Sequence, residues 1–438
     1  MDIAAVLNFI LGWPLMIYVV SVGIICTIAL RFIQIRSFMA AWYYALVPDK
    51  KQAATGEMTP LQAFIGTLNS NLGNGSIAGT ATAIYSGGPG AALWIVLIGV
   101  ILMSVRFAEV YLGASLGSRA GNSKGLGGPM LYLRNVPGGA VLAYCYGVAC
   151  LFFCLLGGNA VQANSMSMSL ASTFGIPLIV IALVILVFIL YVVQGGASRI
   201  MQAAEKIIPI KVGLFFGSSS IVLLYHYQTI GSALKLIVMS ALTPEAAFGG
   251  AVGFTVQQAM RYGMGRSIMS TESGVGTAAV FFGATGDNSP IKSGIISMLS
   301  AFISTTVCFL VALCIVASGV WNSGLTSTPL TIAAFQTVFG SLGGWIVTFL
   351  SVSFGMGVMV VFAYLAREAW YFLTGGKYTQ LFNVLYCAIA FGGAFINVHV
   401  LWAVCDVVNA VMLLINLFGI LYLIPVIQKG LASAHVHD

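Results

Sequence analysis

A run of polar and glycine residues interrupts an otherwise apolar stretch between Pro60 and Pro89. The stretch is long enough to cross a bilayer, and the run falls near its middle, at Asn69, Ser70, Asn71, Gly73, Asn74, Gly75 and Ser76. Backbone groups freed by such a break have no water to bond in lipid, so the break must line a cavity walled by protein. Helices broken at mid-membrane depth form the solute and ion sites of many secondary transporters.

An opened helix offers two kinds of chemistry. The amides that begin its second half favour a carboxylate, and the carbonyls that end its first half suit a small hard cation such as Na⁺. The asparagine side chains add neutral amide groups. Together these features predict a site for a zwitterion that moves with a cation. The alternative is that the small residues only allow close helix packing, which applies best to Gly79, Gly87 and Gly88.

A second interruption is predicted in another apolar segment, within S-A-L-T-P-E-A-A-F-G-G-A-V-G, at Thr243, Pro244, Glu245, Gly249 and Gly250. Proline removes a backbone donor and glycine loosens the turn, so the helix should open there. Corresponding breaks in the two halves of a chain indicate an inverted-repeat transporter. No residue-by-residue repeat is visible, and the symmetry is inferred from the spacing of the breaks.

About eleven apolar segments, each long enough to span the hydrocarbon core, must position these breaks. They are predicted at 6–30, 61–86, 89–117, 140–171, 175–194, 206–226, 230–262, 290–320, 341–373, 379–398 and 400–428. We therefore expect an all-α polytopic membrane protein with a 5+5 inverted repeat and one extra N-terminal helix. Within this single transporter domain, 1–60 holds the extra helix and a loop, 61–226 the first repeat and 230–428 the second.

The composition and the placement of charge support a membrane protein. Hydrophobic residues make up 59% of the 438 and charged residues 7%, which excludes a soluble domain of this length. Every second loop is basic, whereas the loops near residues 87, 173, 228, 330 and 399 lack Lys and Arg. The positive-inside rule then predicts a plasma (inner) membrane protein with its N-terminus outside and its C-terminus in the cytoplasm. This bias accounts for the net charge of +7, so nucleic acid is not expected as a partner.

Four motifs, in the expected order, make the chain resemble the alanine or glycine:cation symporter family. L-G-N-G-S-I-A-G-T-A-T-A-I-Y-S-G-G-P-G-A at 72–91 is the most specific of them. Arg106 with Glu109, expected to form a structural pair one turn apart, G-G-P-M-L-Y-L at 127–133 and S-T-E-S-G-V-G-T-A at 270–278 support it. The resemblance implies a leucine-transporter-like fold and the import of small amino acids on a Na⁺ or H⁺ gradient, with no cofactor besides the transported ion.

The resemblance also implies where the substrate and the ion bind. The substrate is expected between the first break and a second break around Ala247 to Gly250, at Asn71, Gly73, Asn74, Gly75, Ser76, Thr80, Ala247, Gly249, Gly250, Ala251 and Ala363. The cation is expected to bind at Asn69, Asn71, Asn74 and Met359. Oligomeric state is not predicted.

The chain departs from the family pattern around this pocket. Val358 and Met359 stand where the family has two threonines, Ala363 where it has a tryptophan, and Ala251 where a bulky aromatic is common. Two large groups replaced by alanine suggest a substrate somewhat larger than alanine or glycine. The missing threonine hydroxyls weaken one expected sodium ligand, so proton coupling is the alternative to sodium coupling.

Ionisable residues at membrane depth are functional candidates because they are unfavourable there. Candidates for a gate or a proton site are Glu245, Arg367, Glu368 and Asp406, with helix capping, snorkelling or packing as the structural alternatives. Glu272 and Asp287 are expected in a cytoplasmic connection at 263–289, paired there with Arg261 or Arg266.

The sequence thus predicts a secondary active symporter that imports a small neutral amino acid with Na⁺ by alternating access. The chain lacks G-x-S-x-G, H-E-x-x-H and P-loop motifs and its four histidines are scattered, so no enzyme is predicted. A channel is disfavoured because no repeated filter motif occurs. A membrane sensor that binds an amino acid without transporting it is the remaining interpretation.

Overall fold

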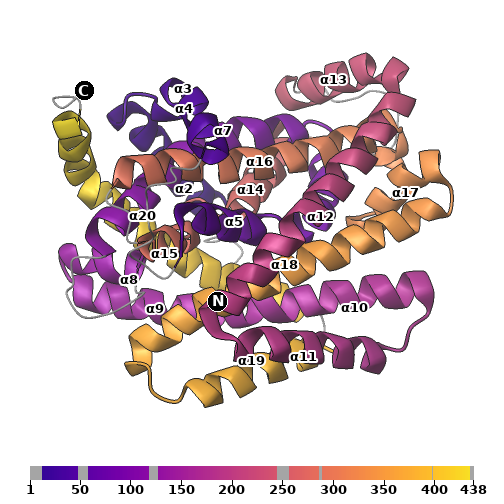
Figure 1. Ribbon diagram of the computed structural model, residues 1–438. Helices are drawn as coiled ribbons and strands as arrows, with labels where there is room; N and C mark the ends of the chain where they lie inside the picture. Colours follow the sequence, from indigo (N-terminus) through magenta and orange to yellow (C-terminus); the bar gives the residue numbers. More distant parts are fainter. Residues whose placement is uncertain are drawn as a thin grey trace, which may run out of the picture.

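The computed structural model describes residues 12–47, 58–117, 127–243, 256–285, 289–396 and 398–434, and these are helical without strands. The long helices cross the molecule side by side (Figure 1). Two of the short elements, η1 and η3, are π-helical turns, and η2 and η4 are 3₁₀ turns. The elements are α2 (Trp13–Ala29), α3 (Ile33–Arg36), α4 (Phe38–Leu46), α5 (Pro60–Asn71), η1 (Gly75–Gly79), α6 (Thr80–Gly87), α7 (Ala91–Gly117), α8 (Pro129–Tyr132), η2 (Leu133–Asn135), α9 (Gly139–Leu155), η3 (Leu156–Ala160), α10 (Val161–Phe174), α11 (Leu178–Gln194), α12 (Gly196–Tyr225), α13 (Tyr227–Leu242), α14 (Val256–Thr271), α15 (Thr277–Gly283), α16 (Pro290–Ala317), η4 (Val320–Asn322), α17 (Ser327–Phe339), α18 (Leu342–Thr374), α19 (Thr379–Gly393) and α20 (Val398–Ala434).

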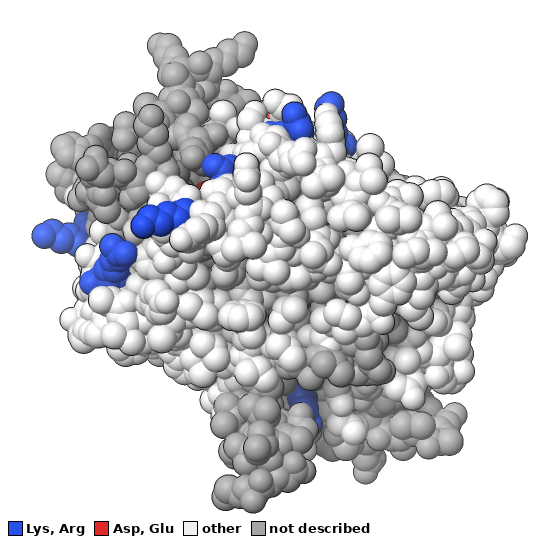
Figure 2. All heavy atoms as spheres, turned by 90° about the horizontal axis from the view of Figure 1, so that it is seen from below, with Lys and Arg blue, Asp and Glu red and all other residues white. Residues whose placement is uncertain are grey.

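The helices have the lengths and surfaces of an integral membrane protein. Among the described residues, six stretches are long and apolar enough to cross a membrane: Ala91–Leu116, Gly139–Phe174, Gly196–Tyr225, Pro290–Ala317, Leu342–Thr374 and Val404–Ser433. Shorter apolar helices lie at Trp13–Ala29, Leu178–Gln194 and Thr379–Gly393. Figure 2 shows a face whose described part is uncharged over most of its area, with Lys and Arg chiefly along its left and upper margins. The prediction of an all-α membrane fold is confirmed.

The first interrupted helix consists of α5, η1 and α6. Its start is fixed by a capping box, in which Gln62 N donates to Thr59 Oγ1 (3.2 Å) and Thr59 N donates to Gln62 Oε1 (2.9 Å), with Pro60 in the first turn. The α-helical ladder ends at Asn71, and the chain resumes as the π turn η1. The break predicted from the polar run is therefore present.

A second interruption is described at a place where the sequence analysis did not predict one. The described part of the predicted seventh segment contains α13, which ends at Leu242, and α14, which begins at Val256; residues 244–255, which carry the expected break, lie outside the described residues. The described break is at 272–276, between α14 and α15, where Gly274 and Gly276 have φ of 89° and 95°. Reading 263–289 as a cytoplasmic connection is wrong for 263–283, because its polar residues are buried among helices.

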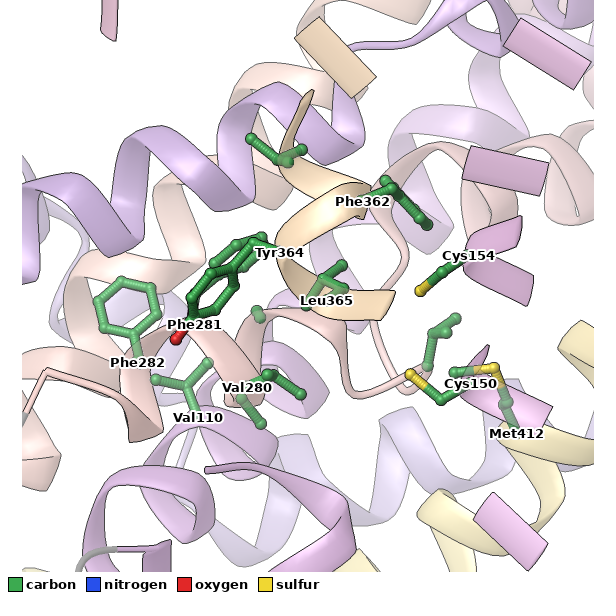
Figure 3. Packing of buried hydrophobic residues seen from close by; sticks show 14 of the residues in the cluster. Val110, Cys150, Cys154, Val280, Phe281, Phe282, Phe362, Tyr364, Leu365 and Met412 are labelled. Carbon is green, nitrogen blue, oxygen red and sulfur yellow. The ribbon is translucent and has the colours of Figure 1, made fainter. Parts of the chain in front are cut away.

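The halves of the two interrupted helices pack crosswise. The first half of one, α5, packs against the second half of the other, α15, and α6 packs against α14. A stacked pair, Phe281 of α15 and Tyr364 of α18 with ring centroids 5.6 Å apart, joins them to the surrounding bundle (Figure 3). This arrangement brings the two breaks together in the interior.

Candidate functional site

A cavity of about 70 Å³ lies where the two breaks meet. A buried water needs about 15 Å³ on such a measure, so the cavity has room for several waters or one small solute. Its polar wall comes from the first break and from α14, and aromatic rings complete it from α9, α18 and α20. The residues that line it are Ser70, Asn71, Gly73, Gly75, Ser76, Phe153, Gly157, Gln162, Arg266, Met269, Glu272, Val275, Val358, Phe362, Trp402, Cys405, Asp406 and Asn409.

Side chains compensate for the backbone bonds that the first break removes. Ser76 Oγ donates to Asn71 O (3.2 Å), and Gln162 Oε1 of α10 accepts from both Asn74 N and Asn74 Nδ2 (3.4 Å each). Gly73 is required by close packing, since a Cβ there would lie 2.9 Å from Val358 Cγ2. These bonds satisfy part of the polar groups that the break exposes to a non-aqueous interior, while Asn71 Nδ2 stays unbonded among the described residues.

The second break is held by polar side chains from three other helices. Gly274 N donates to Glu109 Oε2 of α7 (2.9 Å), and Gly274 O accepts from Asn416 Nδ2 of α20 (2.8 Å). Tyr146 of α9 donates its hydroxyl to Val275 O (2.7 Å). These partners replace water for a loop whose positive φ values only glycine adopts readily.

Arg106 and Glu109 form the predicted structural pair, which is confirmed. Arg106 Nη1 lies 2.8 Å from Glu109 Oε1, both side chains are fully buried, and Arg106 Nη2 also donates to Thr271 O at the end of α14. We expect Arg106→Met to lower the free energy of unfolding by about 3–5 kcal/mol, because it leaves the Glu109 carboxylate buried without its counter-ion.

Thermal unfolding in detergent checks this prediction, with Arg36→Met as the matched control because Arg36 is exposed and makes no described ion pair. Equal melting temperatures for the two variants would contradict a stabilising role for the buried pair.

Glu272 joins the two breaks directly. Its Oε2 accepts from Ser70 Oγ of the first interrupted helix (3.2 Å) and from Thr277 Oγ1 at the start of α15 (2.8 Å). The expectation that Glu272 pairs with Arg261 or Arg266 is wrong, because its carboxylate is buried in the site and bonded to hydroxyls. Asp287 lies outside the described residues.

Several polar groups at the cavity have no partner among the residues that the structure describes. Arg266 is 7% exposed and forms no hydrogen bond or ion pair within the described residues, although its guanidinium lies against the first break: a Cβ added to Gly75 would be 3.0 Å from Arg266 Nη2. Asn71 Nδ2 is likewise buried and unbonded. On the α20 wall, Asn409 Oδ1 is buried without a partner among the described residues, and Asp406, which is exposed, makes no bond to them. The cavity thus has unbonded hydrogen-bond donors on the side of the first break and α14, and unbonded hydrogen-bond acceptors on the side of α20.

Of the other residues expected in the site, some line the cavity, some are buried without lining it, and some lie outside the described residues. Asn71, Gly73, Gly75, Ser76 and Asp406 line the cavity, whereas Asn69, Asn74 and Thr80 are buried behind it, the Thr80 hydroxyl without a partner. On α18 the lining residues are Val358 and Phe362, while their chain neighbours Met359 and Ala363 are buried and do not line it. Glu368 is buried and Arg367 partly exposed farther along α18. Glu245, Ala247, Gly249, Gly250 and Ala251 lie outside the described residues.

Four polar residues of the cavity were not expected there: Asn409, Gln162, Arg266 and Glu272. A signal for Glu272 exists in the sequence, because the second break repeats the pattern of the first. Gly73-Asn74-Gly75-Ser76 corresponds to Gly274-Val275-Gly276-Thr277, and Asn71 corresponds to Glu272. Gln162 has no comparable local signal, since only the fold brings α10 to the first break.

Comparison with known proteins agrees with this architecture. The model of the sodium:alanine symporter family matches residues 2–435. An uncharacterized transporter of Haemophilus influenzae is 33% identical over 431 residues, covering 97% of this chain and 94% of that protein. The sodium/alanine symporter AgcS of Methanococcus maripaludis is 29% identical, covering 98% and 96%. The crystal structure of a mutant manganese transporter from Eremococcus coleocola superposes with a TM-score of 0.51 at 12% identity, over 85% of this chain and 78% of that one, and is similar in fold alone.

Proposed function

The chain belongs to the sodium:alanine symporter family, and from this premise we propose that it imports a small neutral amino acid by alternating access, coupled to a Na⁺ or H⁺ gradient. The family predicted from the motif at 72–91 is confirmed, and it is a family of transporters. The substrate would bind in the cavity between the two breaks, and rocking of the paired repeats would open that cavity to each side of the membrane in turn.

One observation carries this proposal: the unpartnered polar groups around the cavity match the charges of a zwitterion. Arg266 and Asn71 supply donors for a carboxylate next to the first break, and Asp406 and Asn409 supply acceptors for an ammonium group. Arg266, Asn71 Nδ2 and Asn409 Oδ1 are buried, whereas Asp406 is exposed. Buried polar groups without partners are unfavourable, so the gathering of these three at one cavity indicates a ligand that satisfies them. The name of the archaeal relative, a sodium/alanine symporter, supports a small neutral amino acid.

The size of the cavity favours the small end of the range. Phe153, Phe362 and Trp402 line it, and Phe153 and Phe362 contact each other with ring centroids 5.7 Å apart. Phe362 thus contributes a large aromatic group one residue before Ala363. We propose alanine, glycine or a slightly larger neutral side chain as the substrate, facing these rings.

Uptake of radiolabelled amino acids into proteoliposomes tests the proposal, with Na⁺ and pH gradients imposed separately. Alanine and glycine should accumulate and should compete with each other, whereas charged amino acids should compete poorly. A protein that binds alanine in detergent yet never accumulates it in vesicles would instead be a sensor. Uptake that neither saturates nor responds to a gradient would indicate a channel.

A further inference from the structure

A buried lysine occupies the carbonyl end of the first break. Lys211, from the middle of α12, is fully buried, and its Nζ donates to Leu72 O (2.9 Å) and to Asn69 O (3.3 Å). These carbonyls end α5, where a helix leaves its last carbonyls unbonded and carries the negative end of its dipole. They form the part of the break that favours a small cation.

No carboxylate balances this ammonium within the described residues. Lys211 has no ion pair among these residues, and its Nζ also lies over the Phe354 ring of α18, 5.4 Å from the ring centroid. α5 and α17, both packed against α12, contain no charged residue. The counter-charge for Lys211 is therefore the pair of carbonyls and the helix end, which is the environment that a bound alkali ion would have.

The surroundings are shaped to admit the ammonium group. A Cβ added to Gly357 of α18 would lie 2.8 Å from Lys211 Nζ and 2.6 Å from Asn69 Oδ1, so only glycine leaves the required space. Asn69 Oδ1 has no hydrogen-bond partner. The next residues of α18, Val358 and Met359, carry no side-chain oxygen that could complete the coordination of an alkali ion.

We propose that the Lys211 ammonium takes the place of a transported cation at the first break, so that this chain binds its amino acid without Na⁺. A sodium ion bound to the same two carbonyls would lie against a second positive charge in a medium of low dielectric, where like charges repel strongly. The ammonium instead supplies the charge that holds the end of α5 in the shape required for substrate binding. This inference rests on the proposed amino-acid transport.

Alanine binding to the purified full-length protein in detergent tests the proposal, measured by scintillation proximity with Na⁺ or with choline as the only monovalent cation. The wild type should bind with the same affinity, within about twofold, in both salts. Lys211→Ala should lose at least about 10-fold in affinity in choline and recover part of it in Na⁺, a coupling of ordinary size for linked sites. Lys206→Ala, on the exposed face of the same helix, is the matched control and should behave as the wild type.

The outcomes separate the two proposals. Wild-type binding that requires Na⁺ would overturn the inference, and so would a Lys211→Ala protein that binds normally in choline. If Lys211→Ala fails to fold, Lys211→Met replaces it, because methionine keeps most of the side-chain volume. The comparison of wild-type binding in Na⁺ and in choline requires no variant. Absence of binding for every amino acid in either salt would instead count against the proposed transport function.

Discussion

Replacing Arg266 by glutamine is expected to weaken alanine binding by about 10- to 150-fold. A hydrogen bond to a charged group contributes about 1.5–3 kcal/mol, and each 1.4 kcal/mol corresponds to about a factor of ten in affinity. The guanidinium lies beside Gly75 at the cavity without a protein partner, so a substrate carboxylate is the group that would satisfy it. Equilibrium binding of labelled alanine measures the effect.

The stability of the empty protein distinguishes binding from a structural role. Arg266 makes no described hydrogen bond or ion pair, so Arg266→Gln should leave the melting temperature of the substrate-free protein unchanged or raise it, because it removes a buried charge. Arg261→Gln is the control, since Arg261 lies on the same helix, is exposed and rests over the ring of Tyr262. Normal binding by the Arg266 variant, or a large fall in its melting temperature, would show that the side chain is not a carboxylate ligand.

The first break was predictable from sequence because the residues on both sides of it are predominantly apolar. The polar run from Asn69 to Ser76 stands out within an apolar stretch, and lipid forbids such a run except at a cavity. The family motif at 72–91 then indicated the fold. Local composition was sufficient to predict this break, because the constraint that lipid places on a polar run acts on the run itself.

The second break was missed because its polar groups are satisfied from afar. Thr271, Glu272 and Gly274 resemble an aqueous loop when only composition is considered. In the fold, Arg106 bonds Thr271, Ser70 bonds Glu272, and Glu109 and Asn416 bond Gly274. Pro244 and the glycines that follow gave a stronger helix-breaking signal nearby. Periodicity and hydropathy contain no information about such long-range partners. The repeated Gly-x-Gly-Ser/Thr pattern marks the position of the second break but not the residues that bond it.

Lys211 and Arg266 show the same limitation. Arg266 was expected in a cytoplasmic connection, and Lys211 falls near the start of the predicted span 206–226, where a basic side chain can snorkel to water. The fold instead buries both, one at the carbonyl end of the first break and the other at the cavity. A buried charge is tolerated only where backbone dipoles or a ligand compensate it, so the function of each depends on contacts that a linear pattern does not reveal.

Gly274→Ala should disable transport by straining the second break. Gly274 has a φ of 89°, which side-chain-bearing residues adopt only at a cost of about 1–3 kcal/mol, and a Cβ there would lie 2.8 Å from Leu417 Cδ2. The same residue bonds Glu109 through its amide and Asn416 through its carbonyl, so relief of the strain disturbs both contacts. A bias of 1–3 kcal/mol between conformations changes a coupled equilibrium by about 5- to 150-fold. We therefore expect uptake into proteoliposomes to fall by about that factor.

Gly265→Ala provides the matched comparison for this effect. Gly265 lies on α14, has a negative φ, and an added Cβ would meet only Met16 Cε at an ordinary 3.6 Å. Alanine in a helix interior is favoured over glycine by about 1 kcal/mol, so this variant should melt at the same or a higher temperature and should transport normally. Equal uptake by both variants would mean that the loop at 272–276 tolerates ordinary backbone angles, and the second break would then not be a fixed part of the substrate site.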